Sequence, residues 1–243
     1  MTRQERAVRT RTALIEAAAE LFHRDGYEAT SLAMVTARAK VSNGALYFHF
    51  ATKADLADAV AASAAARLAG LIAGGAGGAG AAGPAGGAAV GRGLARGSGR
   101  AEGSEPAEAG GPAQVSGLQG LIDVTHAFVR ALGSDVVLRA GFDLSGVRER
   151  AVVGEDLRDA WREWVQGALA AAEARGALAP GVSGRDAAVA VVAATVGIEV
   201  LGAYDGQWLS PDPLTWFWHL LLPALATTAD RAGLAAAGSG AAG

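Results

Sequence analysis

Two short helical patterns lie close together in the stretch SLAMVTARAKVSNGALYFHF, which spans residues 31–50. The first covers 31–39, where apolar residues recur at the spacing of one helical face. The second covers 43–49 and begins only three residues later. Two helices joined by so short a turn have the spacing of a helix-turn-helix, whose second helix enters the major groove of DNA. This stretch therefore predicts a DNA-binding head.

Three residues around these helices predict how the helices begin and end. Thr30 and Ser42 precede the first and second helix, and each hydroxyl can accept a hydrogen bond from a backbone N–H of the first turn. We therefore expect both residues to be N-caps. Lys40 follows the first helix at a position that often needs a positive φ, where a side chain is strained by ~1 kcal/mol.

The second helix is expected to contact DNA with residues of two kinds. Small or amide-bearing residues at its start allow a close approach to base edges. Hydroxyl, imidazole and ammonium groups further along can reach phosphates. Phe48 and Phe50 are expected to be core residues instead. The predicted DNA contacts are Thr30, Ser42, Asn43, Gly44, Ala45, Tyr47, His49 and Lys53.

The runs GYEATSLxxV and VSNGALYFHFxxKxxL resemble the tetracycline-repressor (TetR) family of regulators over residues 8–68. Within that family, GALYFHF and the later run VLRAG at 137–141 are similar to the gamma-butyrolactone autoregulator receptors and their pseudo-receptor relatives. The resemblance implies an all-α protein with a three-helix head and a helical body that binds a signal molecule and dimerises. It also implies a repressor that a gamma-butyrolactone-type signal releases from a pseudo-palindromic operator, or a pseudo-receptor responding to an antibiotic or biosynthetic intermediate.

Three residues depart from the family pattern. Lys40 stands where the family usually has glycine, and Asn43 stands where lysine or arginine is common. An asparagine favours an adenine-type contact over a guanine or phosphate contact. Ala33 replaces the acidic residue that would complete a capping box. The resemblance therefore implies the DNA-binding role without fixing the operator sequence.

The run WRE at 161–163 resembles the segment that carries the pocket tryptophan of these receptors. The resemblance implies that Trp161 lines the signal-binding cavity, with Trp164 and Phe142 as further candidates. An indole offers a broad apolar wall and one N–H, which suits a lactone with an alkyl tail. The alternative is that Trp161 is an ordinary core residue.

Charge and composition change along the chain. Arg3, Arg6, Arg9 and Arg11 surround the single acidic residue Glu5 and predict an arm that reaches DNA or a frayed, solvated terminus. Residues 74–113 are dominated by glycine and alanine and cannot bury enough apolar surface to offset their chain entropy. The predicted organisation is a head with a basic arm (1–51), a connecting helix (52–73), a disordered insertion (74–113), a ligand-binding and dimerisation domain (114–230) and a disordered tail (231–243).

The last two predicted helices, within residues 186–229, are expected to form a homodimer. Trp216, Phe217, Trp218 and residues 220–222 are too many large apolar side chains for one face of a monomer. A two-fold dimer would bury them and present two recognition helices to one operator.

Other classes of protein lack sequence support. Cysteine is absent, which excludes disulfides and thiolate metal sites. The four histidines are isolated, and no zinc-protease, nucleophile-elbow or phosphate-loop motif occurs. We therefore expect no catalytic residues, metal or cofactor, although a helical enzyme and a protein-only adaptor remain weaker alternatives. Polar residues directly after Met1 argue against a secretory signal and favour the cytoplasm.

Overall fold

The computed structural model describes residues 2–76, 117–145 and 156–241. Most of the predicted insertion at 74–113 therefore lies outside the described residues. Within them, the chain is all-helical apart from one isolated antiparallel bridge between Leu178 and Ala226, which confirms the predicted fold class. The helices are α1 (Arg3–Asp25), α2 (Leu32–Ala39), α3 (Asn43–His49), α4 (Lys53–Ala76), α5 (Gly117–Ser134), α6 (Val136–Ser145), α7 (Leu157–Ala174), α8 (Gly184–Gly202), η1 (Gly206–Leu209), α9 (Pro211–Leu225), α10 (Thr228–Arg231) and η2 (Ser239–Ala241).

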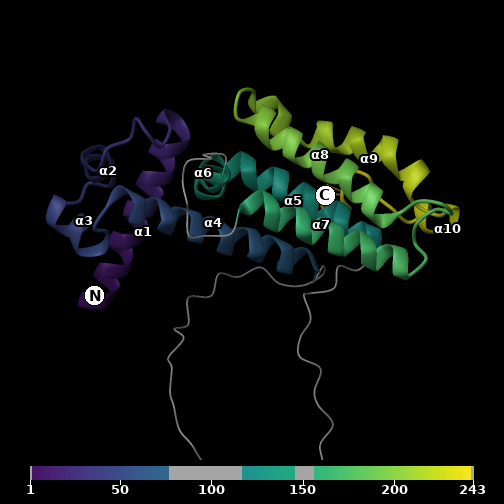
Figure 1. Ribbon diagram of the computed structural model, residues 1–243, viewed down its shortest axis with the longest axis horizontal. Helices are drawn as coiled ribbons and strands as arrows, with labels where there is room; N and C mark the ends of the chain where they lie inside the picture. The colour runs from purple at the N-terminus through teal and green to yellow at the C-terminus, as the bar shows by residue number, and fades with distance from the viewer. Residues whose placement is uncertain (1, 77–116, 146–155, 242–243) are drawn as a thin grey trace, which may run out of the picture.

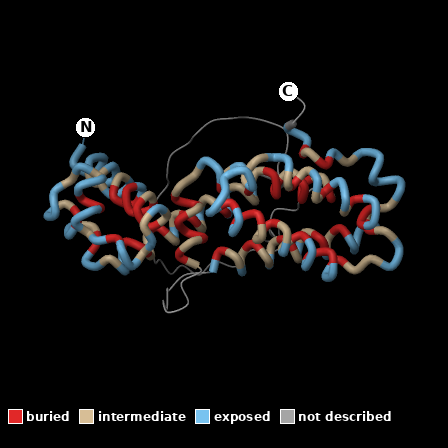
Figure 2. The backbone as a smooth tube through the Cα atoms, turned by 90° about the horizontal axis from the view of Figure 1, so that it is seen from above, coloured by how far each residue is buried: buried red, intermediate tan, exposed pale blue. Residues whose placement is uncertain are grey.

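The molecule is elongated, with a small head at one end and a helical body at the other (Figure 1). Helices α1, α2 and α3 form the head, and α4 runs from the head along the body. Helix α6 is short and packs against both α1 and α4 where head and body meet. Buried residues follow the inner sides of the helices in both parts (Figure 2), so one hydrophobic core continues from head to body.

Helix α1 begins at Arg3, within the segment predicted to be an arm or a frayed terminus. Thr2 and Glu5 form a reciprocal capping box, in which the Glu5 N–H donates to Thr2 Oγ1 (3.2 Å) and the Thr2 N–H donates to Glu5 Oε2 (2.9 Å). The arginines predicted to form an arm therefore lie on the first turns of α1. The sequence-based prediction rested only on the negative charge of Glu5. Its position three residues after Thr2 is that of a residue that completes a capping box.

The cap of α2 is also shifted by one residue. Ser31 is the N-cap and accepts a hydrogen bond from the Met34 N–H at 3.2 Å. The predicted cap, Thr30, is buried and donates its hydroxyl to the Gly26 carbonyl at 2.8 Å, which closes the preceding turn. The prediction for Thr30 is therefore wrong. Lys40 adopts the left-handed conformation that its position predicted, with φ 55°.

Two buried tryptophans tie the helices of the body together through threonine hydroxyls. Trp161 donates its indole N–H to Thr195 Oγ1 at 2.9 Å, which joins α7 to α8. Trp218 donates to Thr125 Oγ1 at 3.0 Å, which joins α9 to α5. Trp218 is fully buried, so its predicted place in a dimer interface is wrong. Its neighbour Trp216 is 64% exposed on the outer face of α9.

The segment after α10, predicted to be disordered, packs back onto α5. Ala236 is buried, and its carbonyl lies 2.9 Å from His126 Nε2. Ser239 donates its backbone N–H to Asp123 Oδ1 at 2.7 Å. Burial lowers the pKa of His126, so the neutral ring donates to this carbonyl. The alanine- and glycine-rich composition predicted disorder for this segment. The prediction missed that side chains of α5 supply hydrogen-bond partners for the backbone of the segment.

One described helix is long and apolar enough to cross a membrane, counting length and composition alone. It is the stretch Lys53–Gly74 of α4. Leu56, Val60 and Leu68 of this stretch are buried in the core, and a core helix of a soluble protein passes the same test. The stretch is therefore weak evidence for a membrane span.

Candidate nucleic-acid interface and aromatic cluster

Helix α3 presents an exposed surface at the end of the head. Ser42 is its N-cap, as predicted, and accepts a hydrogen bond from the Ala45 N–H at 3.2 Å. Leu46 is fully buried and anchors the helix to the core. Residues 42–44 are exposed, and Tyr47 is 60% exposed. The start of the helix and the Tyr47 hydroxyl are therefore available to a macromolecule.

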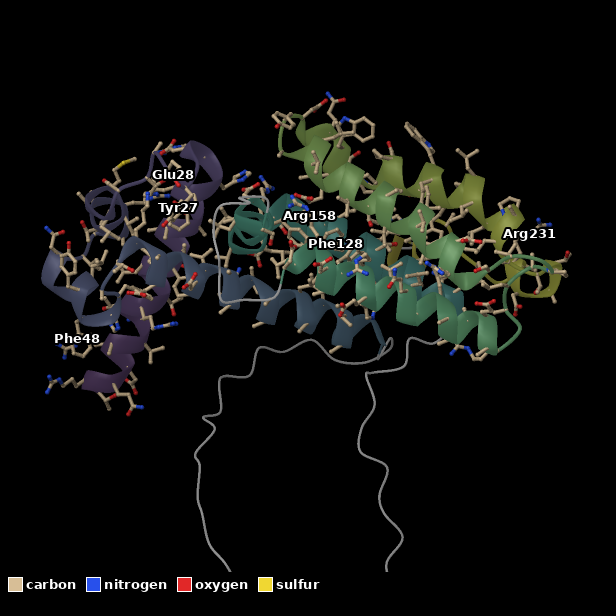
Figure 3. The ribbon with its side chains drawn as sticks, viewed as in Figure 1. Tyr27, Glu28, Phe48, Phe128, Arg158 and Arg231 are labelled. Atoms are coloured by element: carbon tan, nitrogen blue, oxygen red, sulfur yellow. The ribbon has the colours of Figure 1, made fainter. Side chains whose placement is uncertain are left out.

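Phe48 is an exposed aromatic residue of α3, in contrast to its predicted place in the core. It was predicted to be core, but it is 74% exposed and lies at the far end of the head (Figure 3). Its ring meets the ring of His49 edge-on at 5.0 Å. Helical geometry explains the error, because Phe48 follows the buried Leu46 by two residues and so faces away from it. Phe50, the other predicted core aromatic, is buried.

Asn43 is oriented from within the head. Its Oδ1 accepts a hydrogen bond from the Thr36 hydroxyl of α2 at 3.0 Å. Thr36 is itself buried, and its single hydroxyl proton is shared between Asn43 Oδ1 and the Ala33 carbonyl, which is also 3.0 Å away. This contact holds the Asn43 side chain against α2, and Asn43 remains exposed toward a bound base or phosphate.

Lys53 does not join this surface. Its ammonium donates to the carbonyls of Tyr27 (2.9 Å), Glu28 (3.3 Å) and Thr30 (3.1 Å), and it lies 4.2 Å from the centre of the Tyr27 ring. Three acceptors match the three protons of a lysine ammonium. The structure thus uses Lys53 to fasten the loop between α1 and α2 to the start of α4, in contrast to the predicted phosphate contact. In Figure 3, Tyr27 and Glu28 lie together in this part of the head.

The three predicted ligand residues come together in one aromatic cluster of the body. The cluster consists of Phe128, Phe142, Trp161 and Trp164. Phe128 stacks on Trp161 with ring centres 4.2 Å apart and meets Phe142 at 5.3 Å. Trp164 lies 5.1 Å from Trp161 and is only half-buried. The other three side chains are almost completely enclosed, so Phe128 occupies the space beside the indole wall.

A partly buried ion pair lies one helical turn from the cluster. Arg158 of α7 binds Glu199 of α8 through two hydrogen bonds of 3.0 Å each. Burial raises the pKa of Glu199, whereas Arg158 opposes that shift by stabilising the carboxylate. Figure 3 labels Arg158 and Phe128, which both lie in the helical body. The cluster is therefore a closely packed apolar region with a charged pair one helical turn away.

No group of three or more histidine or acidic side chains that could hold a metal occurs within the described ranges. The remaining chemical features of the cluster are aromatic faces, one indole–hydroxyl hydrogen bond and the ion pair. Such a set can bind an apolar molecule with few polar groups.

Comparison with known proteins agrees with this geometry. Residues 14–60 match the family model "Bacterial regulatory proteins, tetR family". The chain is 47% identical over 60 residues to the A-factor receptor protein of Streptomyces griseus. This match covers 25% of the chain and only 22% of that relative, so the sequence relationship is established for the head alone.

Solved structures resemble the whole chain. A gamma-butyrolactone receptor, described as ArpA-like, superposes with a TM-score of 0.71 and 27% identity, covering 96% of both chains. CprB from Streptomyces coelicolor, in complex with its biological operator sequence, gives a TM-score of 0.67 and 28% identity over 94% of both chains. Residues 14–60 therefore form a TetR-type DNA-binding head, and the chain as a whole shares the fold of solved gamma-butyrolactone receptors.

Proposed function

We propose that the protein is a cytoplasmic transcriptional repressor that a small, largely apolar signal releases from its operator. The observation that carries this proposal is the pairing of an exposed α3 surface with an enclosed aromatic cluster in the body of the same chain. The relatives are named as receptors and regulators rather than as enzymes. Their names favour a gamma-butyrolactone-type signal, and the alternative is a pseudo-receptor for an antibiotic or biosynthetic intermediate.

The proposed DNA surface is smaller than the sequence alone indicated. Thr30 and Lys53 are removed from it, because both are engaged in holding the head together. Phe48 is added, because an exposed aromatic ring beside Tyr47 can contact a thymine methyl or a sugar. The proposed contacts are Ser42, Asn43, Gly44, Ala45, Tyr47, Phe48 and His49.

The aromatic cluster limits the kind of signal that can act. A molecule bound against Trp161 must displace Phe128, which now covers the indole. Moving a two-state equilibrium from 1:99 to 99:1 takes about 5.5 kcal/mol of differential binding. Burying one methylene supplies about 0.8 kcal/mol, so an alkyl tail of about seven carbons would suffice if its chamber forms only in the released state.

The outer face of α8, η1 and α9 supports a homodimer. Tyr204 is 88% exposed and Leu220 is 82% exposed. A two-fold dimer through this face would bury them and set two α3 helices on a pseudo-palindromic operator. Light scattering is expected to give the mass of a dimer, and Leu220→Asp to give that of a monomer. A monomer in the unmodified protein at micromolar concentration would contradict this proposal.

Gel retardation tests the proposed function. The probe is the DNA upstream of the protein's own gene, and an alkyl-substituted gamma-butyrolactone is titrated into the complex. The protein is expected to retard the DNA, the lactone to release it, and Tyr47→Ala to weaken retardation. Release by a candidate antibiotic but not by the lactone would favour the pseudo-receptor, and absence of retardation would refute the repressor.

Lys53→Ala is expected to destabilise the head without changing how salt affects DNA binding. Removing the ammonium leaves three loop carbonyls without their donor, which should lower the free energy of unfolding by about 1.5 kcal/mol. Each lost lysine–phosphate contact would lower the log–log salt slope by about 0.9. Thermal unfolding and DNA binding at several salt concentrations measure both quantities. Lys40→Ala, at an exposed position, is the control, and a smaller salt slope with unchanged stability would return Lys53 to the DNA surface.

A further inference from the structure

Three consecutive residues of α6 face three different parts of the molecule. A Cβ on Gly141 would lie 2.3 Å from Cβ of Ala64, so α6 and α4 touch there. The Phe142 ring belongs to the aromatic cluster of the body. Asp143 binds His23, which lies in the last turn of α1. This short stretch of α6 therefore contacts the connecting helix, the proposed signal site and the head at once.

His23 is held from both sides by α6. Its Nδ1 lies 2.7 Å from Asp143 Oδ2, and its Nε2 lies 3.2 Å from Arg139 Nη1. A guanidinium can only donate, so Nε2 accepts and the proton of the neutral ring is on Nδ1. His23 then donates this proton to the Asp143 carboxylate. Arg139 is anchored in turn, because its Nε donates to the Leu132 carbonyl of α5 at 2.7 Å.

Asp143 is also linked to the far side of the body. The negative charge of Asp143 adds to the burial that raises the pKa of Glu199. Glu199 is the carboxylate paired with Arg158, one turn from the aromatic cluster. A shift of Asp143 would therefore have a small electrostatic effect on the α7–α8 pair, beside its direct effect on α1.

On the head side, His23 lies close to the loop that positions the DNA-contacting helices. Tyr27 follows it by four residues, and its ring packs against Phe22 at 5.4 Å. The Tyr27 carbonyl accepts a hydrogen bond from Lys53 at the start of α4. Displacing His23 would thus move the end of α1 and the loop that leads into α2.

We propose that His23, Asp143 and Arg139 form a hydrogen-bonded joint that transmits the state of the aromatic cluster to the DNA-binding head. A molecule that displaces Phe128 also displaces Phe142, and with it the neighbouring carboxylate of Asp143. The three residues act as positioning residues, because they contact neither the DNA surface nor the cluster itself. This inference rests on the proposed function and assigns the residues through which the two sites communicate.

The test measures the ratio of DNA affinities without and with an alkyl-substituted gamma-butyrolactone. Lactone binding is followed separately by tryptophan fluorescence. The unmodified protein is expected to show a ratio within about 5- to 150-fold, the usual range of coupling between two sites. The ratio should fall toward one in both His23→Ala and Asp143→Ala, while each variant still binds DNA and lactone. Should His23→Ala fail to fold, Asp143→Ala tests the same bond from the body side.

Two further variants separate the joint from general packing. His23→Asn keeps an amide N–H near the position of Nδ1 and should retain most of the ratio. Glu20→Ala removes an ion pair with Arg38 inside the head and should leave the ratio unchanged. A purely structural role would lower the melting temperature without changing the ratio.

Several results would overturn the joint. One such result is an affinity ratio in His23→Ala and Asp143→Ala equal to that of the unmodified protein. Another is a decrease of the ratio in His23→Asn as large as the decrease in His23→Ala. Both leave the proposed function intact as long as the unmodified protein responds. An unmodified protein that binds DNA and lactone but shows a ratio of one would overturn the proposed function and the joint together.

Discussion

Replacing Trp161 by alanine is expected to lower the free energy of unfolding by about 3–5 kcal/mol, the usual effect of deleting a fully buried aromatic side chain. Trp161 has no exposed surface, stacks on Phe128 and donates to the Thr195 hydroxyl. Its removal would leave a large cavity in the centre of the body. Urea unfolding measures the loss, provided that the dependence on denaturant is unchanged.

Trp208→Ala is the matched control, because Trp208 is 39% exposed and lies outside the aromatic cluster. Its truncation should change stability by less than about 1 kcal/mol. Equal losses in the two variants would contradict a special place for Trp161 in the core. Trp161→Phe keeps an apolar ring and is the milder substitution for testing the proposed signal site, because Thr195 retains its bond to the Val191 carbonyl.

Gly141→Ala is expected to destabilise the protein by about 3 kcal/mol, at the upper end of the usual effect of overpacking. The added Cβ would lie 2.3 Å from Cβ of Ala64 and 2.8 Å from Cδ1 of Leu157, so α6 would have to move away from α4 and α7. In an open helix the same substitution stabilises by roughly 0.5–1 kcal/mol. Gly167→Ala in α7 provides that control, because nothing lies within 4 Å of its added Cβ.

The two glycine variants are thus predicted to change stability in opposite directions in the same thermal unfolding experiment. Combining Gly141→Ala with Ala64→Gly should recover part of the loss, because the second substitution removes the atom that clashes. Additive effects of the two substitutions would show that the contact between α4 and α6 is looser than the structure indicates.

Helix positions were largely predictable from the sequence, because caps and apolar spacing act locally. Ser42 and the residues after it gave the bounds of α3 as the structure has them. The cap of α2 could not be chosen in this way, because Thr30 and Ser31 carry the same functional group side by side. Which of the two hydroxyls faces the helix depends on the turn that Thr30 closes with Gly26.

The roles of individual side chains were less predictable, because they depend on contacts between residues far apart in the sequence. Lys53 has the position and charge of a phosphate contact, but it binds carbonyls more than twenty residues earlier in the chain. Phe128 belongs to no sequence motif, whereas the structure places it against Trp161. The joint around His23 links α1 to a helix more than one hundred residues later, which no local pattern indicates.

The glycine contact between α4 and α6 also has a mechanical consequence. At Gly141 the two helices approach more closely than a side chain would allow, so a tilt of one helix on the other would turn about that point. Ala64, at the crossing, lies eleven residues from the start of α4, which corresponds to roughly 16 Å of helix. A tilt of about 10° around this fulcrum would swing the head end of α4 by roughly 3 Å, which is about the length of a hydrogen bond.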